Sequence, residues 1–307
     1  MAALKKQLHY VIKVTVKASH IIDEICMSRP VPALSISFEE CIEHASDYAW
    51  GGAKYNTGNG IICIGVSDLI NSASAIKHVV YDTKQVSMPR LLDALDRDFD
   101  GCEDVYKACM EAPKYGNDDP RADRLAAELF AYIADEIENY SSKFGRMTPG
   151  ILPVSGNTPF GAEVGALPSG RRAGKPLADG VSPNSGTDTN GPSAVLKSVS
   201  YIPHDRFVQG TLLNMKLAPE MVATENGIHQ LMALLKSLCT LGVYHVQFNV
   251  VDQEKLMQAQ KHPEEHRDLL VRVAGYTAFF VELGKDVQDD IIARTVQTER
   301  GALVSSG

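Results

Sequence analysis

A single glycine interrupts the apolar run 269–280, which reads LLVRVAGYTAFF, and two kinds of role would explain it. Without a Cβ, glycine adopts a positive φ at a turn or lets another backbone approach closely, and this is the common reason for a buried glycine. The second role is chemical. Loss of a hydrogen atom from the Cα of Gly275 would leave a planar carbon radical stabilised between an amide nitrogen and a carbonyl, whereas a Cβ would hinder that planarity.

A carbon radical at Gly275 would need protection from oxygen and from solvent. The side chains close to it in sequence are mostly apolar, so we expect them to form a dry surround. The residues expected to provide it are Val273, Ala274, Tyr276 and Phe279.

Several segments of the chain resemble those of one enzyme family, in the family's order. They are GGAKYN (51–56), APKYGNDD (112–119), PGILPVSGNTPFG (149–161), GALPSGRRAGKPLADGVSPNSGTDTNGPSAVLKSVS (165–200), GTLLNMK (210–216) and, around Gly275, YHVQFNVVD, AQKHPEEHRDL, RVAGYTAFF and QDDIIART. On these motifs the chain resembles the glycyl radical enzymes of the pyruvate formate-lyase-like superfamily over about residues 30–300. It is more similar to the dehydratase and lyase branch than to pyruvate formate-lyase, a formate acetyltransferase.

The resemblance implies that Gly275 carries the radical, with Arg272, Val273, Ala274 and Tyr276 forming the loop around it. A separate radical-SAM activating enzyme would install the radical as a post-translational modification, so no bound cofactor and no metal are expected in the chain. The radical would then pass to a cysteine that attacks a small-molecule substrate. The implied reaction is anaerobic cleavage of a C–O, C–N, C–S or C–C bond.

The implied cysteine has no counterpart among the six cysteines of this chain. In the family it lies in a Gly-Cys-X-Glu motif upstream of every segment matched here. Cys102, in the stretch GCED, has a carboxylate two positions later, but Asp104 would more simply support the first turn of a helix through the helix dipole. Cys63 and Cys239 lie in apolar segments that favour inert core thiols. We therefore expect a partner that carries the cysteine, either an N-terminal half or a longer homologue.

Arginines provide the remaining site candidates. Arg146, just before a Thr-Pro-Gly stretch, resembles a position near the substrate pocket of some relatives, and its fixed charge would suit an anionic substrate group. A surface arginine is the alternative. Arg171 and Arg172 are expected to order a loop through carboxylates such as Asp179.

Hydrophobic spacing predicts a mainly helical first half with short strands. Helices are expected over 4–27, 38–49, 66–79, 87–97, 121–141, 225–239, 253–270 and 286–295, and strands over 61–64 and 243–251. His262-Pro263 is expected to interrupt the helix over 253–270. His245, Gln247 and Asn249 alternate on one face of the second strand, which favours contact with solvent or loops over catalysis. Gly, Pro, Ser, Asn and Asp dominate residues 149–200 and predict ordered loops that line a cleft.

These patterns predict a protein of the α/β class. The resemblance implies the C-terminal portion of a ten-stranded β/α barrel made of two parallel five-stranded half-sheets, with the glycyl radical loop entering from one end. It also implies a barrel part over residues 1–200 and a glycine radical domain over residues 201–307.

Composition excludes several other classes of function. The chain has 307 residues, 44% of them hydrophobic and 22% charged, which is typical of a globular protein. A net charge of -8 argues against nucleic-acid or anionic-membrane partners. The cysteines form no CxxC pair, and no stretch of 18 apolar residues occurs, so we expect a soluble cytoplasmic protein with reduced thiols. HExxH, Walker A, dinucleotide-binding and serine-elbow sequences are absent.

Two further hypotheses stay open. The chain is either a spare radical module that docks onto a longer homologue with a damaged glycyl loop, or an inactive remnant that no longer carries a radical. The sequence does not specify the substrate, whether the chain acts alone, or its oligomeric state, and a homo-oligomer is compatible with it.

Overall fold

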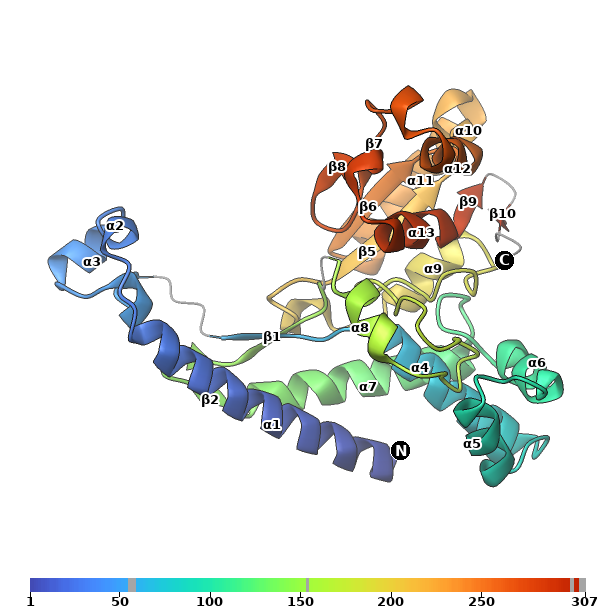
Figure 1. Cartoon of the computed structure of the whole chain (residues 1–307), viewed down its shortest axis with the longest axis horizontal. Helices are drawn as coiled ribbons and strands as arrows, with labels where there is room; N and C mark the ends of the chain where they lie inside the picture. The colour runs from blue at the N-terminus through green and yellow to red at the C-terminus, as the bar shows by residue number, and fades with distance from the viewer. Residues whose placement is uncertain (55–58, 153–154, 299–300, 304–307) are drawn as a thin grey trace. The chain divides into compact units, whose positions relative to one another are not determined.

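The computed structural model describes residues 1–54, 59–152, 155–298 and 301–303. The chain folds into two compact units, which Figure 1 shows coloured along the sequence. Unit 1 comprises residues 1–62, 130–150 and 205–209, and unit 2 comprises residues 63–129, 151–204 and 210–307. Both units combine helices with short strands, so the predicted α/β class is confirmed.

Unit 1 is built on the long helix α1 (Ala2–Met27) and the second half of α7 (Pro120–Glu138). The Tyr132 hydroxyl on α7 donates to the Lys5 carbonyl on α1 at 2.9 Å. Two small sheets complete the unit. β1 (Gly60–Ile62) pairs in parallel with β4 (Thr148–Gly150), and β2 (Ser141–Ser142) pairs antiparallel with β3 (Gly145–Arg146).

Two predicted elements of unit 1 are shorter than expected. The helix predicted over 38–49 is wrong in its second half, because α3 (Glu39–Glu43) ends early and the 3-10 turn η1 (Tyr48–Trp50) follows, with Asp47 as its N-cap. The Asp47 carboxylate accepts hydrogen bonds from two backbone amides, those of Val31 at 3.0 Å and Ala49 at 2.8 Å, which favours a capped turn over a continuous helix. The prediction that β1 is buried is confirmed for Ile61, which is 9% exposed, but is wrong for Ile62, which is 41% exposed because this sheet has only two strands.

Unit 2 begins with a helical layer. Its elements are α4 (Val66–Ala75), the π-helix η2 (Ile76–Asp82), α5 (Met88–Asp96) and α6 (Glu103–Glu111), which pack around a shared apolar cluster. The first half of α7 follows. The four-residue spacing predicted along the whole of α7 is confirmed, because Leu125, Leu129, Ile133 and Ile137 are all buried.

The loop-rich stretch between residues 151 and 204 carries only two described α-helices, α8 (Asn157–Glu163) and α9 (Pro192–Val199). Loops of this stretch line a cavity of about 620 Å³ within unit 2, as predicted. Arg171 orders them by donating to backbone carbonyls, among them those of Gly161 at 2.6 Å and Gly165 at 3.0 Å. Arg172 pairs with a carboxylate as expected, that of Asp100 at 3.2 Å. The expected pairing with Asp179 is wrong, since that carboxylate is buried against Arg294 at 3.1 Å.

The rest of unit 2 is a mixed sheet with strand order β10-β9-β5-β6. β5 (Leu212–Leu217) is parallel to both β6 (His245–Val250) and β9 (Val296–Thr298), and β10 (Gly301–Leu303) is antiparallel to β9. The described part of the chain thus forms a four-stranded sheet, and the ten-stranded barrel is not formed within it.

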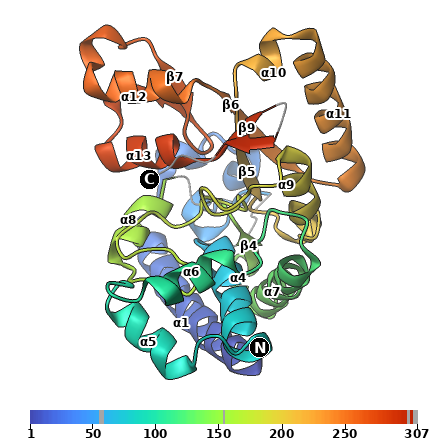
Figure 2. The same ribbon diagram turned by 90° about the vertical axis from the view of Figure 1, so that its right-hand side faces the viewer.

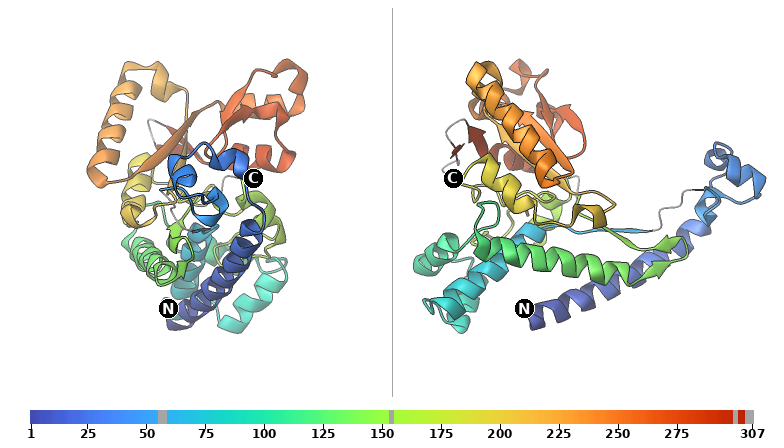
Figure 3. Two further views of the ribbon diagram at one scale, coloured as in Figure 1. Left: turned by 90° about the vertical axis from the view of Figure 1, so that its left-hand side faces the viewer. Right: turned by 180° about the vertical axis from the view of Figure 1, so that it is seen from behind.

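Helices flank this sheet on two sides. α11 (Glu225–Leu241) connects β5 to β6, and Figures 2 and 3 show it on the side away from α12 and β7. The opposite side carries a β-hairpin and two helices. These elements are α12 (Gln253–Lys261), β7 (Leu270–Arg272), β8 (Thr277–Phe279) and α13 (Lys285–Ala293).

The helices of the sheet region begin and end at residues with clear capping roles. Thr224 accepts from the amide of Gly227 at the start of α11 at 2.9 Å, and Gly242 ends that helix with φ +70°. Asp252 caps α12 in the same way by accepting from the amide of Glu254 at 2.7 Å. The interruption predicted at His262-Pro263 is confirmed, because α12 ends there and Pro263 cannot continue the backbone hydrogen bonds. The predicted continuation to residue 270 is wrong, since no α-helix resumes before β7.

Candidate active site at the Gly275 turn

Gly275 lies in the turn of the β7–β8 hairpin. Arg272 and Thr277 form the last pair of the ladder, and the amide of Val273 donates to the carbonyl of Tyr276 at 2.9 Å. Gly275 has φ +83°, a left-handed conformation that strains an L side chain by about 1–2 kcal/mol. The turn therefore favours glycine for its backbone, as the first of the two sequence interpretations predicts.

The space around the Cα of Gly275 is open. A Cβ built on it would meet no atom within 4 Å in the described part of the chain, and the residue is exposed. Close packing is thus not the reason for glycine at this position. The Cα hydrogens are accessible to a reagent carried by another molecule.

The expected apolar enclosure of Gly275 is only half present. Val273 and Ala274 are 1% and 0% exposed, but Tyr276 and Phe279 are 37% and 40% exposed. The hairpin packs on one side only, and its other side is open among the residues that the structure describes. The cluster beneath the packed side consists of Leu256, Ala259, Val271, Val273, Phe280 and Ile291.

A polar network from β6 holds the turn. The side-chain oxygen of Gln247 accepts from the amide of Gly275 at 3.1 Å and from Nε of Arg272 at 3.0 Å. Arg272 also donates from Nη1 to the hydroxyl of Thr277 at 3.0 Å and from Nη2 to the carbonyl of Gly275 at 3.4 Å. Both ends of Gly275 are therefore in contact with side chains that the fold fixes.

Asn249 holds the backbone of Arg272 from the same strand. Its side-chain oxygen accepts from the Arg272 amide at 2.8 Å, and its side-chain nitrogen donates to the Arg272 carbonyl. Gln247 and Asn249 are 8% and 7% exposed. The predicted loop contact of this strand face is confirmed for both residues. The sequence did not show that the contacted loop is the one that carries Gly275. The signal for a buried polar contact was the alternation of Gln247 and Asn249 with apolar residues in this strand.

A buried arginine anchors the start of the turn. Arg294, directly after α13, donates from Nη1 to the carbonyl of Val273 at 2.9 Å. Its Nη2 lies 2.9 Å from Asp290 and 3.1 Å from Asp179, so two carboxylates face one guanidinium. Burial raises the pKa of Asp290, although the positive charge of Arg294 acts to lower it. Sequence analysis did not single out Arg294, which reaches the turn only through the tertiary fold.

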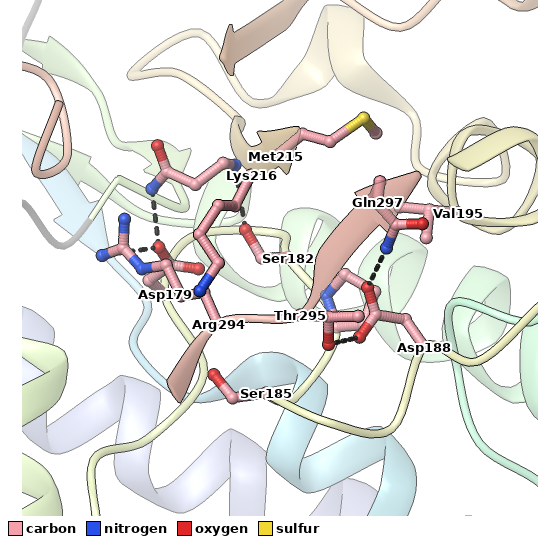
Figure 4. Close-up of a pocket in the computed structure, with 12 residues that line it drawn as sticks. Asp179, Ser182, Ser185, Asp188, Val195, Met215, Lys216, Arg294, Thr295 and Gln297 are labelled. Carbon is pink, nitrogen blue, oxygen red and sulfur yellow. Dashed lines mark hydrogen bonds and ion pairs between the residues drawn. The ribbon is translucent and has the colours of Figure 1, made fainter. Parts of the chain in front are cut away.

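Arg294 also borders a small polar pocket of about 20 Å³, which Figure 4 shows with its lining residues. The buried amine of Lys216 on β5 donates to the carbonyls of Ile291 and Ile292 at 3.3 and 2.9 Å, which caps the end of α13. Burial, and after it the charge of Arg294, lowers the pKa of Lys216 to about 8. On the other wall, burial raises the pKa of Asp188 to about 6 although Thr295 and Gln297 donate to its carboxylate.

Arg146, the substrate-binding candidate, lies on β3 in unit 1. Its Nη2 is 3.0 Å from Glu138 and its Nε donates to the Glu138 carbonyl at 2.9 Å, so a carboxylate already neutralises its charge. The side chain is 64% exposed. Its role in gripping a substrate stays a prediction, as does the division of the chain at residue 200.

The cysteines occupy three kinds of environment. Cys102 is buried as the first residue before α6, and Asp104 lies in the first turn, as predicted. Burial raises the pKa of Cys63 to about 12, which suits an inert thiol. Cys239 was expected in the core, but it is exposed because it lies on the outer face of α11.

Neither a metal site nor a membrane span is found in the described ranges. No group of three or more His, Cys, Asp or Glu side chains could hold a metal ion there. None of the helices described is both long and apolar enough to cross a bilayer.

Comparison with known sequences places this geometry in a family. The sequence profile described as "Pyruvate formate lyase-like" matches residues 1–161, and the profile described as "Glycine radical" matches residues 177–281, which include Gly275. The chain belongs to the glycyl radical enzymes of the pyruvate formate lyase-like family. The resemblance found from the motifs is thereby confirmed.

Its relatives are dehydratases and lyases. Trans-4-hydroxy-L-proline dehydratase of Clostridioides difficile is 40% identical over 96% of this chain and 38% of its own length. Isethionate sulfite-lyase of Nitratidesulfovibrio vulgaris is 36% identical over 94% of this chain and 36% of its own length. The B12-independent glycerol dehydratase of Clostridium butyricum, solved with glycerol bound, matches 97% of this chain and 38% of its own with a TM-score of 0.92 and 40% identity.

The chain spans about 38% of the length of these relatives. The fold of the matched part is that of a glycyl radical enzyme. The activities and substrates of the relatives belong to chains more than twice as long.

Proposed function

We propose that this chain is the radical-bearing part of a glycyl radical dehydratase or lyase, and that Gly275 stores the unpaired electron. The observation that carries the proposal is the Gly275 turn. Its Cα is unobstructed, its peptide groups are held by Gln247 and Arg272, and it lies within the segment that matches the glycine radical profile.

The radical would form by transfer of one hydrogen atom. A carbon radical generated from S-adenosylmethionine on a separate activating enzyme takes a hydrogen atom from the Cα of Gly275, so one C–H bond forms and another breaks without a change in charge. The exposure of Gly275 supports direct access of such an enzyme. The chemistry must be anaerobic, since oxygen adds to carbon radicals.

The second step needs a thiol from outside this chain. Gly275 would take a hydrogen atom from a cysteine, which regenerates the Cα–H bond and leaves a thiyl radical to attack the substrate. Cys102 does not fit, because it is 6% exposed and packs in the cluster around Phe99 and Val105. We propose that the thiol, its carboxylate partner and the rest of the ten-stranded barrel belong to a segment or partner that supplies the remaining length of the relatives.

Unit 1 offers an apolar surface for that partner. One face of α1 exposes Val11, Val14, Ile21, Ile22 and Ile25, at spacings that place them along one stripe of the helix. Such a stripe suits burial by another polypeptide. The open side of the Gly275 hairpin would need a cover of the same kind.

The test is anaerobic activation followed by electron paramagnetic resonance. The chain, a radical-SAM activating enzyme, S-adenosylmethionine and a reductant should give a doublet signal, which Gly275→Ala abolishes. Gly242→Ala is the matched control, since Gly242 also has a positive φ and open space but lies at the end of α11. A doublet that survives Gly275→Ala, or no signal with several competent activators, would reject the proposal and favour an inactive remnant.

The spare-module hypothesis is the second candidate, and the exposure of Gly275 in the chain by itself favours it. It predicts that the activated chain restores turnover to a full-length relative whose own radical glycine has been replaced by alanine. A split enzyme would instead need an N-terminal portion without any glycine radical segment. Mixing the chain with each partner separately distinguishes the two assemblies.

A further inference from the structure

We propose that Gln247 and Arg272 form a polar clamp that polarises both peptide groups of Gly275 and thereby stabilises a radical on its Cα. This inference rests on the proposed function, because it concerns the same glycine. It assigns Gln247 and Arg272 as positioning residues that set the lifetime and spin distribution of the radical.

The orientation of the Gln247 amide is fixed by its neighbours. A backbone N–H and a guanidinium N–H can only donate, and those of Gly275 and Arg272 both point to one end of the Gln247 side chain, at 3.1 and 3.0 Å. That end must be the oxygen. The amide nitrogen at the other end lies 3.1 Å from Nε2 of His245, which accepts when the imidazole is neutral and carries its proton on Nδ1. Partial burial, and then the charge of Arg272, lowers the pKa of His245 and so favours the neutral ring.

The Arg272 guanidinium faces the other end of Gly275. Its Nη2 is 3.4 Å from the Gly275 carbonyl, while Thr277 holds Nη1 and Gln247 holds Nε. Asn249 fixes the backbone from which the side chain starts. In the described part of the chain no carboxylate pairs with Arg272, so its positive charge acts on the turn and is not neutralised locally.

These contacts act in the same direction on a Cα radical. Such a radical is stabilised when the amide nitrogen donates electron density and the carbonyl withdraws it. An acceptor on the Gly275 N–H makes the nitrogen a better donor, and a cation near the oxygen makes the carbonyl a better acceptor. The arrangement therefore spreads spin from the Cα into both peptide groups.

The clamp also fits the rearrangement that a radical requires. Gly275 has φ +83°, so its peptide groups must rotate as the Cα becomes planar. A side-chain acceptor can follow that rotation, whereas a ladder of strand hydrogen bonds would resist it. The two contacts to Gly275 come from side-chain termini, not from the backbone of a neighbouring strand.

The test compares variants of the activated full chain by electron paramagnetic resonance. Gln247→Leu removes the acceptor at similar size, Gln247→Glu retains it, and Arg272→Lys retains charge without the planar fork. Gln260→Leu is the matched control, because Gln260 donates to Asp289 at 2.7 Å on the exposed side of α12. Circular dichroism and thermal unfolding check that each variant is folded.

Loss of the clamp should concentrate spin on the Cα. We expect Gln247→Leu to widen the α-proton splitting of the doublet and to shorten the radical half-life by about 2- to 10-fold, the effect of losing one hydrogen bond. Gln247→Glu keeps an acceptor for the Gly275 amide but places a negative charge beside Arg272, so Gln247→Glu and Arg272→Lys should each retain the two properties only in part. Gln260→Leu should leave them unchanged. If Gln247→Leu fails to fold, Gln247→Glu and Arg272→Lys against the unchanged protein decide the question.

The two proposals fail in different ways. If the unchanged chain gives no doublet, the proposed function is rejected and the clamp with it. If it gives a doublet whose splitting and half-life are the same in Gln247→Leu, Arg272→Lys and Gln260→Leu, the radical assignment stands and the clamp is rejected.

Discussion

At the scale of single residues, Gly275 combines two requirements that are usually separate. Its φ of +83° favours glycine for conformational reasons, and its open Cα makes glycine chemically accessible. Conformation alone would explain a glycine at this turn. The match to the glycine radical profile and the contacts from Gln247 and Arg272 support the chemical role in addition.

Replacing Gly275 by alanine should leave a folded protein. No atom of the described residues would clash with the new methyl group, so the expected loss of unfolding free energy is only the left-handed strain, about 1–2 kcal/mol. Chemical denaturation of Gly275→Ala and Gly242→Ala should give similar losses. A loss of unfolding free energy above about 4 kcal/mol for Gly275→Ala alone would contradict this expectation, because left-handed strain does not account for a loss of that size.

Lys216 should make stability depend on pH in the alkaline range. Its pKa is about 8 in the folded chain and 10.5 in an ordinary environment. Between about pH 8 and pH 10.5, Lys216 is therefore mostly deprotonated in the folded chain and mostly protonated in the unfolded chain. The unfolding free energy contributed by Lys216 therefore rises as the pH rises from about 8 to about 10.5.

Lys216→Met removes this contribution and leaves two carbonyls at the end of α13 without their donor. Urea unfolding of the unchanged protein and of Lys216→Met at several pH values gives the difference in their unfolding free energies. Groups that titrate in the same way in both proteins do not contribute to this difference. A difference between the two proteins that does not change with pH would contradict the assignment.

At the scale of elements, the hairpin is held from two directions. Gln247 and Asn249 hold it from β6, and Arg294 holds it from its position directly after α13. The glycine turn is thus fixed by strands and a helix that are distant from it in sequence. A change in any of these elements should reach the turn.

Removing the Arg294 anchor should destabilise the chain strongly. Arg294→Met leaves Asp179 and Asp290 buried without their cation, which costs about 3–5 kcal/mol. Arg97→Met is the control, since Arg97 forms an exposed pair with Asp93 and should cost less than about 1 kcal/mol. Denaturant midpoints measure both. Equal midpoints for the two variants would show that Arg294 does not anchor the turn.

Sequence patterns predicted the elements better than the contacts between them. α7 follows from a four-residue apolar spacing that needs no tertiary information, and α1 ends at Met27, where the helix predicted over 4–27 ends. The contact of Gln247 with Gly275 depends on how β6 and the hairpin pack, which periodicity does not encode. The same limit explains why Asp179 was paired with the wrong arginine and why Cys239 was placed in the core.

At the scale of the whole molecule, this chain matches only part of its relatives' length. It covers about 38% of the relatives, and the residues described form a four-stranded sheet without the barrel. The β7–β8 hairpin, which is packed on one side and exposed on the other, is consistent with a chain that covers only part of its relatives. A partner or further segment would close over the turn and supply the thiol.

Oxygen should cut an activated chain at one place. Oxygen adds to the Cα radical and the backbone then breaks at Gly275, which releases a fragment of residues 276–307. Mass spectrometry after air exposure should find this fragment only in samples that were activated first. Cleavage at another residue, or the same cleavage without activation, would be evidence against a radical at Gly275.

The most direct test of the central claim uses isotopes. The chain is produced with glycine deuterated at the Cα, activated anaerobically, and compared with unlabelled chain by electron paramagnetic resonance. A radical on Gly275 predicts a doublet from the remaining α-proton that collapses to a narrow unsplit line in the deuterated chain. A signal whose splitting is the same in both samples would place the electron elsewhere and contradict the account.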